Sequence, residues 1–474
     1  MNFIVYDLIF LATFLVFLFS FLYVKRENIK RDGLLILYRA SWGIKFMNFV
    51  GKRFSKSLYF FSYISIFTGY VLMLAVIYLV GRIVYIYASS PEIVRAIKAP
   101  PIIPLVPYID KIIDVPFFPP FYFTFWVIII AVVAISHEFS HGIFMRRYNI
   151  KIKSTGFAFF PWFFPIFPAA FVEQDEKSMN RTKKFEQMAV LSAGTFANLI
   201  TAVLFFGVLW IFFALSFAPS GVSFDTYAYS LVGVSAINQV NEKTVENSTY
   251  ERILELTNEE ELNKIKTDNG NYVSSREFLE NQENNKGILI LYYDAPAINS
   301  GIGNVILEID GEKTRSLKEL QNDISSRSPG DKILIRSLTS GGKEIETEIT
   351  LGENPSNKGT AWLGIGFVDS EPQGNIGKIY SKLNFKEKNI YYEPNFDAAL
   401  FIYNLLWWLI LISLSVALVN MLPVGIFDGG RFFYLTVAGL TKNENIARKS
   451  FAFFTYLILF LIFVLMFFWV KSFF

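Results

Sequence analysis

Six stretches of about 20 apolar residues constrain this chain more than any other feature. A bilayer core of roughly 30 Å is spanned by about 20 residues at helical rise. Charged residues make up only 18% of the 474 residues, below the roughly 25% of soluble domains. We therefore expect a polytopic α-helical membrane protein with about six transmembrane helices. The expected spans are residues 3–24, 59–80, 121–144, 188–215, 398–418 and 451–470.

Basic residues gather in the segments after the first, third and fifth spans. Alternating helices place these three segments on one side, which the positive-inside rule makes cytoplasmic. The N terminus and residues 220–395 are then extracytoplasmic in a multi-pass protein of the cell membrane. Residues 218–395 hold about 27 acidic and 18 basic residues, so the net charge of +3 conceals a polarised molecule.

Four regions follow from the spans. Residues 1–119 are an N-terminal two-helix membrane region with a basic cytoplasmic segment and an extracytoplasmic loop, and residues 120–219 begin a membrane core. Residues 220–395 are an inserted extracytoplasmic α+β domain, and residues 396–474 complete the core. Residues 154–172 are rich in Phe and Pro and too short for another span. We expect a re-entrant hairpin-like segment there, next to a polar site; a loop on the lipid interface is the alternative.

The insert alternates short strand-like runs with turn signals. Residues 286–294 and 304–311 predict strands, residues 317–325 a helix, and residues 332–351 a hairpin. Residues 245–285 are polar and fit no strand pattern well, so we expect a partly helical insertion there.

The order of these elements resembles a PDZ domain. PDZ domains capture peptides by adding a strand to the edge of a sheet. The resemblance implies peptide binding at the loop of Gly301, Ile302 and Gly303. A small β-rich domain that binds no peptide is the alternative.

Both histidines of the chain lie in one pentapeptide, His137-Glu138-Phe139-Ser140-His141, within the third span. Positions i and i+4 share one helix face, so both imidazoles can reach one cation with Glu138 beside it. An anionic Glu among apolar residues costs about 3 kcal/mol or more unless it has a partner, which indicates a functional site. A satisfied pair of core histidines is the alternative.

The third ligand of such a site must be a carboxylate, because the chain has no Cys and no further His. The same scarcity excludes disulfides, thiolate zinc sites and three-histidine metal sites. Asp428 is the best candidate, since Pro423 and Gly425 interrupt a helix end just before it. Alternation of the spans places Asp428 on the same side as His137. An Asp-Gly pair can also be a simple turn.

These motifs resemble the site-2 protease family of intramembrane zinc metalloproteases, across most of residues 120–470. The resemblance rests on His137 to Gly142, on Ala170 to Glu173, on Gly194 and Asn198 within residues 193–198, and on Asn420, Pro423, Asp428 and Gly429. The Pro-rich loop at 99–120 and the basic stretch before the second span look similar to archaeal members.

The resemblance implies one Zn²⁺ per chain, bound by His137, His141 and Asp428. It makes Glu138 the general base and implies that Asn198 binds the substrate or the oxyanion. An amide that mediates helix packing is the alternative for Asn198.

The implied activity is cleavage of transmembrane segments of membrane proteins, as in regulated intramembrane proteolysis, near the cytoplasmic side. Substrates would be transmembrane proteins that have already lost their ectodomain, and no nucleic acid is involved. The PDZ-like insert would filter substrates by size or bind the tail left by an earlier cut. A catalytically silent membrane receptor or scaffold is one alternative, although the chain keeps all four key residues. A metal or ion transporter is the other, although the repeated halves typical of transporters are not found.

Overall fold

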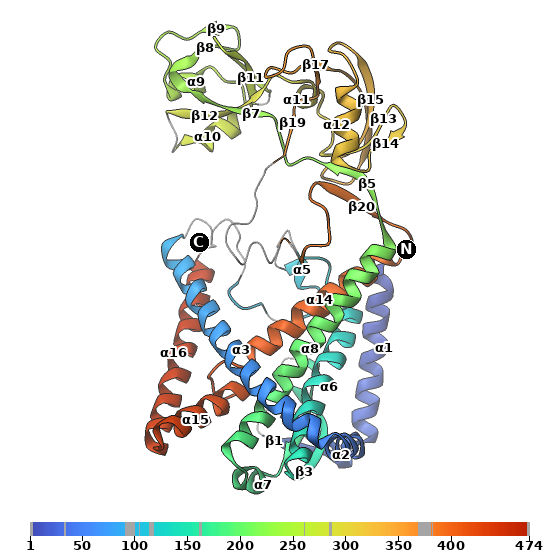
Figure 1. The fold of residues 1–474 in the computed structure, drawn as a ribbon, viewed down its shortest axis with the longest axis vertical. Helices are drawn as coiled ribbons and strands as arrows, with labels where there is room; N and C mark the ends of the chain where they lie inside the picture. Colours follow the sequence, from blue (N-terminus) through green and yellow to red (C-terminus); the bar gives the residue numbers. More distant parts are fainter. Residues whose placement is uncertain are drawn as a thin grey trace. The chain divides into compact units, whose positions relative to one another are not determined.

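The computed structural model describes residues 3–32, 35–90, 100–103, 105–112, 118–160, 164–259, 261–283, 287–367, 381 and 383–471. The chain divides into two compact units (Figure 1). The membrane unit is Met1–Phe213 with Leu400–Phe474, and the second unit is Ala214–Ala399. The second unit spans the segment expected to be an insert at 220–395.

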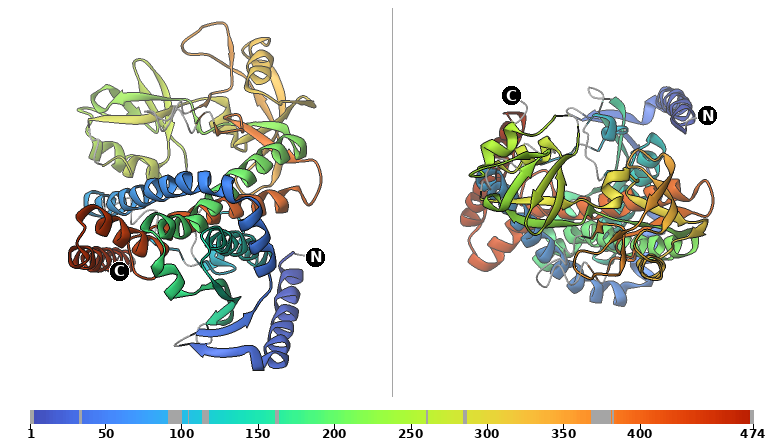
Figure 2. Two further views of the ribbon diagram at one scale, coloured as in Figure 1. Left: turned by 60° about the horizontal axis from the view of Figure 1, so that its bottom comes forward. Right: turned by 90° about the horizontal axis from the view of Figure 1, so that it is seen from above.

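Six helices of the described chain are long and apolar enough to cross a bilayer. They are α1 (Phe3–Val24), α3 (Ser55–Ser89), α6 (Phe123–Arg147), α8 (Lys184–Ser216), α14 (Ala399–Val419) and α16 (Glu444–Lys471). Each coincides with one expected span, so the prediction of a polytopic helical membrane protein is confirmed. Within the membrane unit, α1 and α16 lie at opposite edges and α6, α8 and α14 lie between them (Figures 1 and 2).

Shorter elements connect these helices. They are the 3-10 turn η1 (Arg26–Asn28) and the helices α2 (Ile44–Arg53), α5 (Ile109–Ile112), α7 (Glu176–Arg181) and α15 (Asp428–Thr441). Helix α2 packs closely on α6, because Gly142 has no side chain where a Cβ would collide with Met47. Met47 is fully buried in a core shared with α3, α8 and α15.

A four-stranded antiparallel sheet lies in the membrane unit. Its strands, in the order β1-β2-β3-β4, are β1 (Ile29–Asp32), β2 (Leu35–Ala40), β3 (Ile152–Phe160) and β4 (Phe164–Gln174). Gly156 allows the strands to pair closely, since a Cβ there would collide with the carbonyl oxygen of Tyr38. Strands β3 and β4, which cover the described part of residues 154–172, thus pair with each other within a larger sheet. The segment after the first span was expected only to be a basic connection, and the structure shows that it supplies β1 and β2.

The second unit contains two larger sheets. The first has the order β7-β12-β11-β10-β8-β9, with β7 (Tyr229–Gly233), β8 (Ile237–Val240), β9 (Lys243–Thr244), β10 (Asn263–Thr267), β11 (Gly270–Ser274) and β12 (Ile288–Tyr293). The second has the order β16-β15-β13-β5-β20, with β5 (Phe217–Ser223), β13 (Val305–Ile309), β15 (Lys332–Leu338), β16 (Glu344–Thr350) and β20 (Ile390–Pro394).

Short strands and helices complete the second unit. Strand β14 (Glu312–Lys313) pairs with β13, and two further ladders join β6 (Thr226–Tyr227) to β19 (Ile365–Gly366) and β17 (Gly352–Glu353) to β18 (Ala361–Trp362). The remaining elements are η2 (Val234–Ala236), α9 (Tyr250–Glu255), α10 (Arg276–Glu280), α11 (Pro296–Ser300) and α12 (Leu317–Ser325). The strands and the helix predicted between residues 286 and 351 are confirmed.

One structural motif occurs in both larger sheets. The β8–β9 hairpin turns at Asn241 and the β13–β14 hairpin at Asp310, both with a positive φ close to 48°. Asn241 exchanges hydrogen bonds with Lys264 through its own N–H (2.9 Å) and its side-chain oxygen (3.0 Å). Asp310 does the same with Leu334, at 2.9 and 2.8 Å. The unit therefore repeats one arrangement of a hairpin, a capped helix and a second hairpin.

The expectation for residues 245–285 is wrong where β10 and β11 form a hairpin inside the first sheet. The buried positions of β10 are Asn263, Ile265 and Thr267. Only Ile265 is a large apolar residue, so the alternation of apolar and polar residues that marks a half-buried strand is weak in the sequence.

Candidate metal centre

One turn of α6 carries His137, the neighbouring Glu138 and His141. The two imidazole rings meet edge to face, and their Nε2 atoms are 3.0 Å apart. Both histidines are 8% exposed and line the cleft described below. The i, i+4 spacing thus brings two nitrogen donors to one point, as expected from the sequence.

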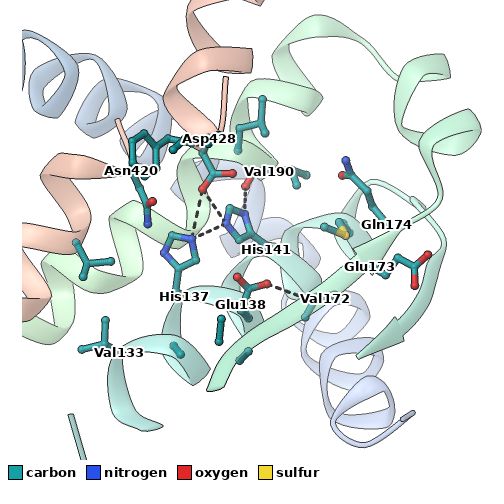
Figure 3. Close-up of a pocket in the computed structure, with 18 of the residues that line it drawn as sticks. Val133, His137, Glu138, His141, Val172, Glu173, Gln174, Val190, Asn420 and Asp428 are labelled. Atoms are coloured by element: carbon teal, nitrogen blue, oxygen red, sulfur yellow. Dashed lines mark hydrogen bonds and ion pairs between the residues drawn. The ribbon is translucent and has the colours of Figure 1, made fainter. Parts of the chain in front are cut away.

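Asp428 reaches the same point from the first residue of α15. Its Oδ2 lies 3.3 Å from Nε2 of His137 and 3.2 Å from Nε2 of His141 (Figure 3). A tight turn between α14 and α15 makes this possible. Gly429 N–H donates to the Asn420 carbonyl (2.8 Å), and a Cβ at Gly429 would collide with Met421. The loop of Pro423 is held by Thr455, whose hydroxyl donates to the Pro423 carbonyl (3.2 Å).

The donor atoms of His137, His141 and Asp428 fit a metal ion. They all lie within 4.8 Å of one another. Nδ1 of His141 lies 2.7 Å from the Val190 carbonyl, so this nitrogen carries the proton and Nε2 presents a lone pair. A lone pair that faces a carboxylate oxygen is repulsive unless a metal ion or a proton lies between them. Two imidazoles and a carboxylate are a ligand set that catalytic zinc uses.

Gly194 gives α8 its close approach to both imidazoles. A Cβ at this position would lie 2.5 Å from Nε2 of His141 and 2.7 Å from Nε2 of His137. Any other residue would therefore occupy the space of the donor atoms. This explains Gly194 as a requirement of the site rather than of the helix.

Asn198 lies behind His137, one turn further along α8. It is fully buried, its Nδ2 is 3.1 Å from Nδ1 of His137, and its Oδ1 accepts from the Ser136 hydroxyl (3.2 Å). If Nε2 of His137 binds a metal, Nδ1 carries the proton, and the amide must turn its oxygen toward the ring. The structure thus places Asn198 as a support of His137, and it does not line the cleft.

Glu138 joins the histidine-bearing turn of α6 to strand β4. The Val172 N–H donates to Glu138 Oε2 (2.9 Å), as Figure 3 shows. Because this N–H points away from β3, the unpaired edge of β4 faces α6. Among the described strands, β4 pairs only with β3. The general-base candidate and an open strand edge therefore lie side by side.

A cleft of about 740 Å³ surrounds these groups. Val133 lies on one side of the histidines, and Glu173 and Gln174 lie on the other (Figure 3). The cleft is apolar around Val133 and polar around Glu173. Its apolar lining includes Leu105, Ile130, Ala134, Ile412 and Val416, and its polar lining includes Lys153, Glu176 and Asn420.

A half-buried ion pair at the polar side was not expected from the sequence. Arg39 of β2 lies 3.1 Å from Glu173 Oε2, and the Ser154 hydroxyl donates to the same oxygen (2.7 Å). The Ser154 hydroxyl, assisted by Arg39, holds the pKa of the Glu173 carboxyl below its usual value. Arg39 is 134 residues from Glu173 in sequence, so no local signal could have linked them.

The loop of Gly301, Ile302 and Gly303 belongs to the second unit. Gly301 ends α11 with φ +63°, and Ile302 is buried. The Gly303 N–H donates to the Ser337 hydroxyl (3.0 Å), and a Cβ at Gly303 would collide with the Leu338 carbonyl. The turn at the end of α11 thus explains Gly301, and close packing against Leu338 explains Gly303.

Fold and site together define a multi-pass membrane protein with a candidate metal centre of two histidines and an aspartate. Residues 125–465, well over half of the chain, match the sequence model of peptidase family M50. The chain belongs to this family, the site-2 protease family, whose members are intramembrane zinc metalloproteases. Comparison of the chain with curated proteins finds no match.

Proposed function

We propose that this protein is a zinc endopeptidase that cleaves transmembrane segments of membrane proteins. One observation carries the proposal: the donor atoms of His137, His141 and Asp428 converge in a cleft where Glu138 lies one residue from the first ligand. Zinc would be held by these three side chains. When bound, it would lower the pKa of a water molecule and stabilise negative charge on the scissile carbonyl.

Glu138 would move the protons of the reaction. Its carboxylate takes a proton from the attacking water and delivers it to the leaving amine. The hydrogen bond from Val172 fixes Oε2, so that Oε1 remains for the water. Because Gly194 has no side chain, α8 leaves room for the two imidazoles at this point. Asn198 orients the His137 ring.

The open edge of β4 would hold the substrate. A peptide bond inside a helix is already hydrogen-bonded, so a transmembrane substrate must unwind before hydrolysis, and its free backbone groups then need partners. The edge at Ala170, next to the Val172 N–H that donates to Glu138, offers such partners beside the base. Strand addition would therefore deliver an extended segment to the base.

The membrane orientation and the second unit complete the proposal. We place the N terminus and the second unit outside the cytoplasm and the metal centre toward the cytoplasm. The reason is that the basic segments of the chain are expected on the cytoplasmic side. Because the chain has no Cys, single cysteines labelled from each side in sealed vesicles test this orientation.

We assign a PDZ-like role to the second unit, which would admit substrates trimmed by an earlier cut. Removing the substrate ectodomain should then increase cleavage.

Glu138→Gln in the full-length protein tests the function. Cleavage of a defined transmembrane substrate in proteoliposomes should fall by roughly 10²- to 10⁴-fold, because the base is lost. Zinc content should stay at one per chain, since no ligand changes. Glu186→Gln at the start of α8, outside the cleft, is the matched control. Retained cleavage in Glu138→Gln, or none by the unaltered protein, would contradict the proposal.

A further inference from the structure

Near one end, the buried side chain of Asp7 attaches helix α1 to α6. Asp7 accepts hydrogen bonds from the Tyr108 hydroxyl (2.7 Å), from Phe123 N–H (2.7 Å), and from the N–H (2.9 Å) and hydroxyl (2.6 Å) of Thr124. Phe123 and Thr124 are the first residues of α6, whose N–H groups have no partner within the helix. Asp7 therefore caps α6 and holds the beginning of α1 against it.

Beyond this attachment, α1 and α6 leave an apolar groove of about 380 Å³ between them. Its walls are almost wholly apolar and include the strand β3. They consist of Phe14, Phe17, Leu18 and Phe21 of α1, of Trp126, Val127, Ile130, Ala131, Ala134 and Ile135 of α6, and of Phe157, Phe159 and Ala170 of the sheet. Packed helices normally interdigitate without such a space. The far end of α1 contacts β2 through Phe21 and Tyr38, whose ring centroids are 5.0 Å apart.

The groove and the catalytic cleft share three residues, Ile130, Ala134 and Ala170. Ile130, Ala134 and Glu138 follow one another at i, i+4 spacing on one face of α6, so Ala134 lies about one turn, roughly 5.4 Å, from the base. Two of the three shared residues are alanines, which leave only a small barrier between the two spaces. An apolar segment in the groove is thus one helical turn from Glu138 and from the open edge of β4.

We infer that this groove is the docking site for the transmembrane helix of the substrate, before its scissile segment unwinds onto β4. The inference rests on the proposed endopeptidase function. The continuity with the cleft favours a substrate helix, because an occupant of the groove must cross only Ala134 and Ala170 to reach the base. The apolar walls suit the side chains of a membrane-spanning helix. A lipid chain would fill the same space without needing that continuity.

Cysteine cross-linking tests the docking site without requiring catalysis. The chain has no Cys, so a single Cys can be placed in the Glu138→Gln protein and linked by a bismaleimide to a Cys in a defined transmembrane substrate. Phe17→Cys lies in the groove, and Val16→Cys is the matched control on the same helix. Their parent side chains are 65% and 68% exposed in the unit, so lipid access is equal. We expect at least roughly tenfold more product from Phe17→Cys. Equal yields from both positions, as for random collisions in a lipid-filled groove, would overturn the inference.

A second measurement separates docking from chemistry. Ala131→Trp fills the groove, and Ala131 does not line the cleft; Ile128→Trp places the same side chain on α6 outside both spaces. Let R be the kcat/KM for the transmembrane substrate divided by that for a short unstructured peptide with the same scissile sequence. R should fall roughly tenfold in Ala131→Trp and stay within about twofold in Ile128→Trp. An unchanged R in Ala131→Trp would overturn the docking site. If the unaltered protein cleaves neither substrate, the proposed function fails, while the cross-linking result still reports on the groove.

Discussion

Asp7 and Asp428 lie at the N-terminal ends of two helices of the membrane unit, but their carboxylates have different partners. Asp7 faces four hydrogen-bond donors, three at the start of α6 and the hydroxyl of Tyr108. Asp428 Oδ2 faces two imidazole nitrogens, of which at least Nε2 of His141 presents a lone pair. A carboxylate that is satisfied by N–H and O–H groups stabilises the fold. A carboxylate that faces two imidazole nitrogens instead matches the ligand set of catalytic zinc and indicates a candidate metal centre.

Replacing Asp428 should have the largest effect on metal binding. Asp428→Asn removes the anionic ligand, and zinc affinity should fall by more than roughly a hundredfold, beyond what loss of a supporting residue causes. Zinc content after dialysis against a chelator measures this. Asp7→Asn is the matched control and should keep one zinc per chain. Equal zinc content in the two variants would remove the distinction drawn between the carboxylates.

Gly194→Ala should lower zinc content and cleavage together, although less than the loss of a ligand does. The added methyl group would lie 2.5 to 2.7 Å from atoms of both imidazoles, so the rings must move apart. Gly207→Ala on the same helix is the control, because a Cβ there meets nothing within 4 Å. Alanine generally favours a helix over glycine by about 0.5 to 1 kcal/mol, so Gly207→Ala should be neutral or stabilising. Full zinc occupancy in Gly194→Ala would show that the site tolerates the methyl group.

Asn198→Ala should lower zinc affinity by roughly 10- to 100-fold, as expected for a residue that orients a metal-binding histidine. Asn198→Asp should rescue zinc binding, because its carboxylate still accepts from Nδ1 of His137. If Asn198 instead donates to the substrate, Asn198→Asp would bind zinc normally but lose kcat. Competition with a zinc indicator, together with kcat and KM, distinguishes the two roles.

The smallest expected effect on zinc, but a clear one on stability, comes from Asp7→Asn. The amide turns an NH₂ group toward N–H donors, and hydrogen bonds to a charged group are worth about 1.5 to 3 kcal/mol each. We expect a loss of roughly 2 kcal/mol and a lower thermal midpoint. Thr13→Val on the same helix, which removes only the exposed bond to the Ile9 carbonyl, is the control. An unchanged midpoint in Asp7→Asn would mean that the cap does not secure α1.

Local patterns predicted the parts of the protein that depend on near neighbours in sequence. Six apolar stretches correspond to six helices, and the spacing of His137 and His141 placed two donors together. Strands with a weak pattern were missed: β1 is four residues long and includes Lys30 and Arg31, and β10 buries only one large apolar residue. In such strands the pairing partners provide the stability, and those partners are distant in the chain.

What the sequence alone determined is the membrane character of the chain, the histidine turn of α6 and the need for a carboxylate as third ligand. Composition and i, i+4 spacing suffice for these, because they depend on the backbone geometry of single helices. The tertiary structure decided which groups surround that turn. Asp7 meets Phe123 across 116 residues, Asn198 meets His137 across 61, and Val172 meets Glu138 across 34. Such contacts depend on how helices and strands pack, so the support of the metal centre and the groove beside it became visible only in the folded chain.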